Sequence, residues 1–175
     1  MELNKIKNLS ILIIFAFCFI THFIYDYFPS FFTSLFFPIN ESVWEHMKML
    51  TSSIIIWEFI LYFILRKNNY HIKNFFLNVL CVCLCSVFIF LILYYSLYPI
   101  IGDNFIINII LLFVSIFISV NIGFKILNND NYSLELLSFI GIIIIYIIFG
   151  VFTYYPPKNT LFIDPINKKY GINFD

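Results

Sequence analysis

The chain of 175 residues has no formal net charge, and 62% of its residues are hydrophobic whereas only 11% are charged. Soluble domains contain about 25% charged residues and about 45 to 50% apolar residues. This composition excludes a soluble globular enzyme, a nucleic-acid-binding protein and a disordered chain, and it predicts an integral membrane protein.

Five apolar stretches are each long enough to cross a bilayer, which takes about 20 residues in a helix. The predicted spans are residues 8–28, 42–66, 72–98, 105–125 and 134–154. Short connections rich in proline, asparagine and aspartate separate them. We therefore expect an all-α fold, a polytopic membrane helix bundle in which residues 1–175 form a single integral membrane domain that ends in a tail at residues 155–175.

The basic residues predict the orientation of this bundle. A cytoplasmic N-terminus would place on the inner side Lys5, Lys7, Arg66, Lys67, Lys73 and Lys125. The two loops on the outer side, residues 29–41 and 99–104, contain no basic residue. The positive-inside rule then predicts a multi-pass protein of the cell membrane with its N-terminus in the cytoplasm. Because five is an odd number of spans, the C-terminal tail is expected to be extracytoplasmic.

Polar residues of all five predicted spans fall at a similar depth on the extracytoplasmic side, at a rise of about 1.5 Å per residue. They are His22, Asp26, Glu45, His46, Lys48, Tyr94, Tyr95, Asn108 and Thr153. Charged groups at this depth are expected to face one another or water, because hydrocarbon solvates them poorly. We therefore expect a polar pocket whose walls are the first two spans.

The start of the second span, FPINESVWEHMKML, is the densest part of this layer. At 100° per residue, one stripe about 60° wide contains Glu41, Glu45, Lys48 and Ser52. On the same spacing His46 lies roughly 100° from Glu45. Ser42 and Glu45 also match the S-x-x-E capping box, which accounts for the acids without any functional role. Helix capping does not account for Lys48 and His46, which lie deeper.

The charges of this layer do not balance if both histidines are neutral. Three acids, Asp26, Glu41 and Glu45, then face the single base Lys48. Protonated histidines, protonated acids or a divalent cation can each remove the excess. The expected metal ligands are His22, Asp26 and His46, although their spacing matches no recognised signature such as H-E-x-x-H. The alternative is a buried, hydrogen-bonded ion network without a metal.

Two further segments contain polar residues. Glu58 lies in the inner half of the second span, where we expect a structural hydrogen bond to Asn78, Cys81 or Ser119. The tail combines aromatic residues with two consecutive prolines and an Asp-Pro turn. It is expected either to cover the polar layer as a lid, with Asp164 or Lys158 facing inward, or to adhere to an apolar surface.

The strings NESVWEH at residues 40–46 and FTYYPP, LFIDP and YGI in the tail resemble an uncharacterised family of small bacterial multispanning membrane proteins, a domain of unknown function. The resemblance extends over the whole chain. The positions it marks as typical of the family are Asn40, Glu41, Glu45, His46, Pro156, Pro157, Asp164 and Pro165. It implies no activity, substrate or cofactor.

The sequence predicts a binding or assembly role, in which the polar pocket recognises a small polar ligand, a lipid head group or a partner protein within the lipid bilayer. The expected ligand-binding residues are His22, Asp26, Asn40, Glu41, Lys48, Asn108 and Asp164. The alternative is a membrane-embedded, metal-dependent hydrolase with Glu45 as general base and His46 as a second catalytic residue. Transport is less favoured, because five helices form a thin wall around a path. The sequence leaves open both enzymatic activity and a divalent metal cofactor.

Overall fold

The computed structural model describes residues 3–70, 72–127, 129–130 and 132–172, and over these residues its regular secondary structure is helical. Five long helices are α1 (Leu3–His22), α4 (Val43–Lys67), α5 (Phe75–Ile101), α6 (Phe105–Leu127) and α7 (Glu135–Tyr154). Two short helices, α2 (Ile24–Tyr27) and α3 (Phe31–Phe36), connect α1 to α4. In the tail, Ile163 and Tyr170 form an isolated antiparallel bridge.

The prediction of an all-α membrane bundle is confirmed. Five helical segments in the described part of the chain are long and apolar enough to span a bilayer, with α1 and α2 together forming the first. Large apolar side chains point outward from these segments, among them Phe63, Phe88 and Ile147 with exposed fractions of 68%, 60% and 58%. Such surfaces are stable against lipid and unstable against water. The chain is therefore a multi-pass membrane protein.

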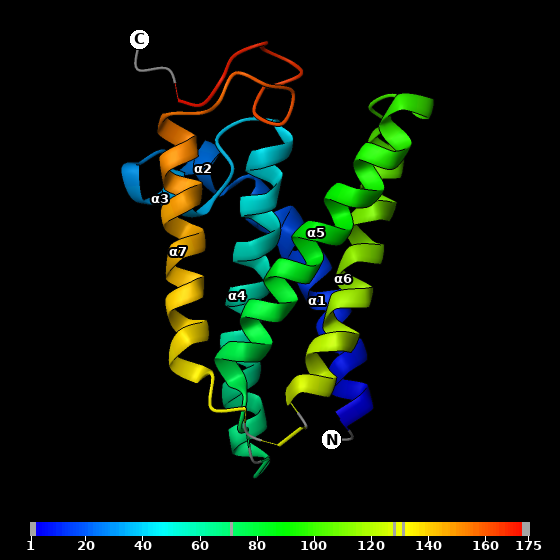
Figure 1. Ribbon diagram of the computed structural model, residues 1–175, viewed down its shortest axis with the longest axis vertical. Helices are drawn as coiled ribbons and strands as arrows, with labels where there is room; N and C mark the ends of the chain where they lie inside the picture. The colour runs from blue at the N-terminus through cyan, green and yellow to red at the C-terminus, as the bar shows by residue number, and fades with distance from the viewer. Residues whose placement is uncertain (1–2, 71, 128, 131, 173–175) are drawn as a thin grey trace.

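The long helices run lengthwise through the bundle, with α5 tilted across α4, and α1 begins at the end of the bundle opposite to the tail (Figure 1). Helix α4 packs against α1 and α5, and α5 packs against both α6 and α7. The short helix α3 packs against α7. Figure 1 shows α2, α3 and the tail gathered at the end of the bundle where α4 begins and α7 ends. We call this the C-terminal end of the bundle.

The first span differs from the uninterrupted helix predicted at residues 8–28. Helix α1 begins at Leu3 and ends at His22, and α2 begins at Ile24. At the break the backbone N–H of Phe23 donates to the carbonyl of Ile20 at 3.3 Å, which tightens the last turn to an i→i+3 bond. The break leaves His22 at the end of a helix, where its side chain can turn toward the start of α4.

The start of α4 is fixed by a helix cap. Ser42 is extended, and its hydroxyl accepts a hydrogen bond from the backbone N–H of Glu45 at 3.4 Å. The second bond of the predicted capping box is replaced, because the Glu45 carboxylate accepts from the backbone N–H of Ile39 at 3.1 Å. The chain before the helix is therefore folded back over its first turn, with Glu41 next to that turn.

Candidate metal-binding site

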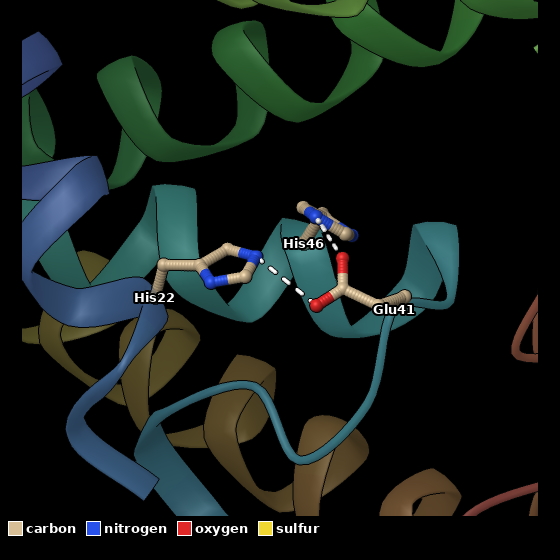
Figure 2. Close-up of side chains that lie close together, drawn as sticks. All are labelled: His22, Glu41 and His46. Atoms are coloured by element: carbon tan, nitrogen blue, oxygen red, sulfur yellow. Dashed lines mark ion pairs between the residues drawn. The ribbon is translucent and has the colours of Figure 1, made fainter. Parts of the chain in front are cut away.

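Three side chains with metal-binding groups converge at the C-terminal end of the bundle. They are His22 at the end of α1, Glu41 in the loop before α4, and His46 in the first turn of α4. One ligand atom from each lies within 4.8 Å of the other two. Figure 2 shows the Glu41 carboxylate between the two imidazole rings, with one oxygen directed at each ring. We call these residues the His–Glu–His triad.

The contacts within the triad are symmetrical. His22 Nε2 lies 3.5 Å from Glu41 Oε1, and His46 Nε2 lies 3.5 Å from Glu41 Oε2. The centroids of the two imidazole rings are 5.2 Å apart. Both nitrogen–oxygen distances exceed the range of about 2.7 to 3.2 Å that is usual for a hydrogen bond to nitrogen. The three side chains therefore face a common point without closing on one another.

The hydrogen bond at the other nitrogen of His46 fixes its tautomer. His46 Nδ1 lies 2.9 Å from the carbonyl oxygen of Ser42, which can only accept, so Nδ1 carries a proton and donates it. In a neutral ring Nε2 is then the unprotonated nitrogen, and its lone pair is directed at a carboxylate oxygen of Glu41. Two lone pairs that face each other repel. A cation between them, either a proton or a metal ion, removes the repulsion.

Glu41 lies before the second span, and its carboxyl group is ionised at neutral pH. The neighbouring His22 imidazole lowers the pKa of Glu41 below its usual range, and each histidine lowers it further whenever it is protonated, while burial acts in the opposite direction. The triad also remains accessible, because the exposed fractions of the side chains are 21% for His22, 29% for His46 and 38% for Glu41. A fourth ligand, such as water, can therefore reach the common point.

A second polar cluster lies on the neighbouring face of α4 and is closed to solvent. Lys48 is fully buried, with its Nζ 2.6 Å from Glu45 Oε2. The same ammonium group donates to the carbonyl of Ser34 at 2.6 Å and to the hydroxyl of Thr153 at 2.8 Å. The Thr153 hydroxyl lies 3.0 Å from Glu45 Oε1. All three ammonium protons and both carboxylate oxygens are thus used, in a buried ion network that joins α3, α4 and α7.

The other residues predicted to form the site lie outside the triad. Asp26 is exposed on α2 and is not one of the three converging ligands. Asn108 donates to Asp103 at 2.7 Å, near the α5–α6 turn. Asn40 accepts from the backbone N–H of Ser42 at 2.9 Å, and its amide nitrogen lies 3.5 Å from the carbonyl of Gly171. It therefore ties the Glu41 loop to the tail.

The tail is held on the C-terminal end of the bundle by aromatic packing and backbone hydrogen bonds. The ring of Phe162 lies 4.8 Å from that of Trp44, and the backbone N–H of Trp44 donates to the carbonyl of Leu161 at 3.0 Å. Asp164 is buried and accepts from the backbone N–H of Ile166 at 2.8 Å and from the Asn167 side chain at 2.9 Å. Its carboxylate therefore stabilises the turn of the tail itself.

A cavity of about 250 Å³ lies between α4, α5 and α7. Its lining is mainly apolar and includes Trp44, Met47, Leu84, Phe88 and Ile148. None of the three triad residues lines it. Hydrocarbon fits such a lining, whereas a polar ligand does not, so the cavity and the triad are separate features.

The sequence predicted Glu41 as a ligand-binding residue but Asp26 as the acidic metal ligand. The i, i+4 spacing that favoured Asp26 assumes a continuous helix through residue 26, and α1 ends at His22. The hydroxyl of Tyr146 was not anticipated as a polar group of the bundle interior. It lies 2.9 Å from the hydroxyl of Ser52. A tyrosine in an apolar run gives no signal that separates it from the many other aromatic residues of this chain.

The comparisons with known proteins place the chain in a family without assigning an activity. No curated protein and no solved structure matches it. The sequence model of a family of unknown function, DUF6512, matches residues 1–172 and confirms the resemblance inferred from the sequence. The chain therefore belongs to this family of unknown function, DUF6512.

Proposed function

We propose that this protein binds a divalent transition-metal ion of the zinc type at the C-terminal end of its membrane bundle. The ligands are His22 Nε2, a carboxylate oxygen of Glu41 and His46 Nε2. The observation that carries the proposal is the unprotonated His46 Nε2 facing the ionised carboxylate at 3.5 Å. Neutral imidazole and carboxylate are ligands that suit zinc, and two histidines with one glutamate form one of its known three-ligand sets.

The surroundings of His46 support a metal rather than a shared proton. Metal-binding histidines usually donate their second ring N–H to a carbonyl or carboxylate, which fixes the tautomer and orients the ring. His46 makes this bond to Ser42. The cap that starts α4 keeps Ser42 and His46 one helical turn apart, so the ring is oriented before any ion arrives. A preorganised ligand reduces the entropic cost of binding.

We propose a binding function and not catalysis. Of the functions that the sequence predicted, binding of a small polar ligand is the one to which a bound metal ion belongs. Three protein ligands leave one position of a tetrahedral zinc ion free for water or for a polar group of a second molecule. Metal-assisted hydrolysis would also need a general base near that position. The buried ion network already uses both oxygens of Glu45, the acid considered for this role. The geometry therefore favours binding over hydrolysis.

We further propose that the site faces the extracytoplasmic side of the cell membrane. The basic residues Arg66 and Lys67 end α4 at the opposite end of the bundle from the triad. Lys5 and Lys7 lie near the N-terminus, at that same opposite end (Figure 1). The positive-inside rule assigns this end to the cytoplasm.

Metal content of the purified protein tests the proposal. The protein in detergent is incubated with zinc, manganese or cobalt, and unbound ion is removed by gel filtration. The metal bound per chain is then measured by elemental mass spectrometry. We expect one zinc ion per chain in the wild type. The variants His22→Ala, Glu41→Gln and His46→Ala should each lose more affinity than the roughly 10- to 100-fold that follows loss of an outer-shell partner.

Two variants serve as matched controls. Asp26→Asn removes the exposed acid next to the triad, and His71→Ala removes the remaining histidine of the chain. Both should retain the metal. The proposal is contradicted if the folded wild type retains no ion, or if the control variants lose as much affinity as the triad variants.

A further inference from the structure

A second group of buried polar atoms lies in the bundle interior, away from the triad. Glu58 follows His46 by 12 residues on α4, about 18 Å along the helix axis at a rise of about 1.5 Å per residue. Its exposed fraction is 1%, and that of Asn78 on α5 is 0%. Asn78 Nδ2 donates to Glu58 Oε2 at 2.8 Å. This bond joins the two helices.

Each side chain of this pair has one oxygen left without a partner. Glu58 Oε1 and Asn78 Oδ1 are both buried, and neither has a hydrogen-bond partner in the described part of the chain. Among the same residues, no lysine, arginine or histidine lies within ion-pair distance of Glu58. Two acceptors without a donor are uncommon in a protein interior, where buried polar groups are nearly always hydrogen-bonded.

The neighbouring helix leaves little room for another donor at this point. A Cβ atom added at Gly123 of α6 would lie within 2.4 Å of Asn78 Oδ1 and 2.3 Å of the Val82 side chain. The α6 backbone therefore packs directly against the amide. The buried thiol of Cys83 on α5 is a further titratable group near Glu58.

We propose that the Glu58 carboxyl group is a proton-binding site, which holds one proton and donates it to the Asn78 amide oxygen. The proton removes the charge, which the apolar surroundings solvate poorly, and converts Glu58 Oε1 from an acceptor into a donor. The amide oxygen that lacks a partner becomes its acceptor. Together with the bond that Asn78 Nδ2 already donates, this makes an acid–amide pair that links α4 to α5 with two hydrogen bonds and no charge.

Infrared spectroscopy of the purified protein at neutral pH tests this protonation state directly. The carbonyl stretch of a neutral carboxylic acid is resolved from the bands of an ionised carboxylate. We expect the spectrum of the wild type minus that of Glu58→Gln to contain one acid band per chain, which shifts in heavy water. The glutamine amide can make both hydrogen bonds of the pair, so this variant is expected to fold.

A matched control and a second variant complete the experiment. Glu45→Gln removes a buried acid that is paired with Lys48, and its difference spectrum should contain carboxylate bands instead. Asn78→Ala keeps Glu58 but removes its partner, so the acid band should move to higher frequency. The proposal is overturned if Glu58→Gln lacks carboxylate bands that the wild type has, because Glu58 is then ionised. It is also overturned if the acid band disappears when sodium is added, because the oxygens of Glu58 and Asn78 then hold a metal cation.

Discussion

Replacing Lys48 with methionine should be among the most destabilising single substitutions in this protein. The side chain is fully buried and its ammonium group has three partners, Glu45, Ser34 and Thr153. Methionine has a similar volume, so packing changes little. The substitution leaves the Glu45 carboxylate buried without a positive partner and removes the donor to the Ser34 carbonyl. The helices that meet at this network, α3, α4 and α7, lose a shared contact.

The magnitude follows from the cost of an unpaired buried charge. Breaking a buried ion pair by removal of one partner costs about 3 to 5 kcal/mol. Protonation of Glu45 would limit the loss to the lower part of that range, because a neutral acid is cheaper to bury than a carboxylate. At about 2 to 4 °C per kcal/mol for a chain of this length, the full range corresponds to a fall of about 6 to 20 °C in the midpoint of thermal unfolding, and protonation of Glu45 places the fall toward the lower end.

The thiols of the chain provide the assay. Cys18 and Cys83 are buried, and Cys81 and Cys85 are partly buried, so a thiol-reactive fluorophore reports unfolding in detergent. The double variant Glu45→Gln with Lys48→Met should recover most of the loss, because it removes both charges and keeps an acceptor at residue 45. Lys125→Met, at an exposed lysine, should change stability by less than about 0.5 kcal/mol.

Two outcomes would refute this reasoning. The first is a Lys48→Met variant that unfolds at the wild-type temperature, which would mean that the network contributes no net stability. The second is a double variant that loses the sum of the two single losses, because uncoupled residues cannot form an ion pair.

Four further predictions concern the site, the packing, the tail and the orientation. Metal retention should fall as the pH drops from about 8 to about 5, because protons compete at the two histidines; Glu41, whose pKa lies below its usual range, stays ionised and does not set the midpoint. This is measured as metal content after gel filtration at each pH. Gly123→Ala should cost about 1 to 3 kcal/mol by overpacking against Val82, and an unchanged unfolding temperature would contradict the close approach. Phe162→Ala removes the ring that packs on Trp44 and should speed tryptic cleavage of the tail. Equal cleavage rates in the variant and the wild type would contradict this role of the ring. A periplasmic reporter enzyme fused to the C-terminus should be active, and an inactive fusion would reverse the proposed orientation.

The membrane fold could be predicted from the sequence because it depends mainly on the length and the hydrophobicity of each span. Each span is longer and more apolar than a soluble helix, and backbone hydrogen bonding inside a bilayer permits only helices or closed barrels. The ends of the helices were less predictable. The break at Phe23 follows from one shifted backbone hydrogen bond, and the surrounding sequence contains no proline or glycine that would predict it.

The buried ion network also has a clear basis in the sequence, since helical phase places Glu45, Lys48 and Ser52 on one face. In the structure Glu45 and Lys48 pair on this face, and the Ser52 hydroxyl donates to the carbonyl of Phe36. Helical phase does not predict which residues of other helices pack against this face of α4. The partners Ser34 and Thr153 come from α3 and α7, and nothing in a single sequence indicates that a six-residue helix folds against the end of the last span.

The position of Glu41 shows where phase ceases to apply. Counted at 100° per residue, Glu41 shares the face of Glu45 and Lys48, but it precedes the cap residue Ser42 and is therefore outside the helix. Its backbone is free to turn, and its carboxylate meets the two histidines instead. For a residue that lies just before a helix, the helical phase calculated from its position in the sequence therefore does not predict the direction of its side chain. This is why four neighbouring ionisable residues separate into a closed structural pair, Glu45 with Lys48, and an open pair of ligands, Glu41 with His46.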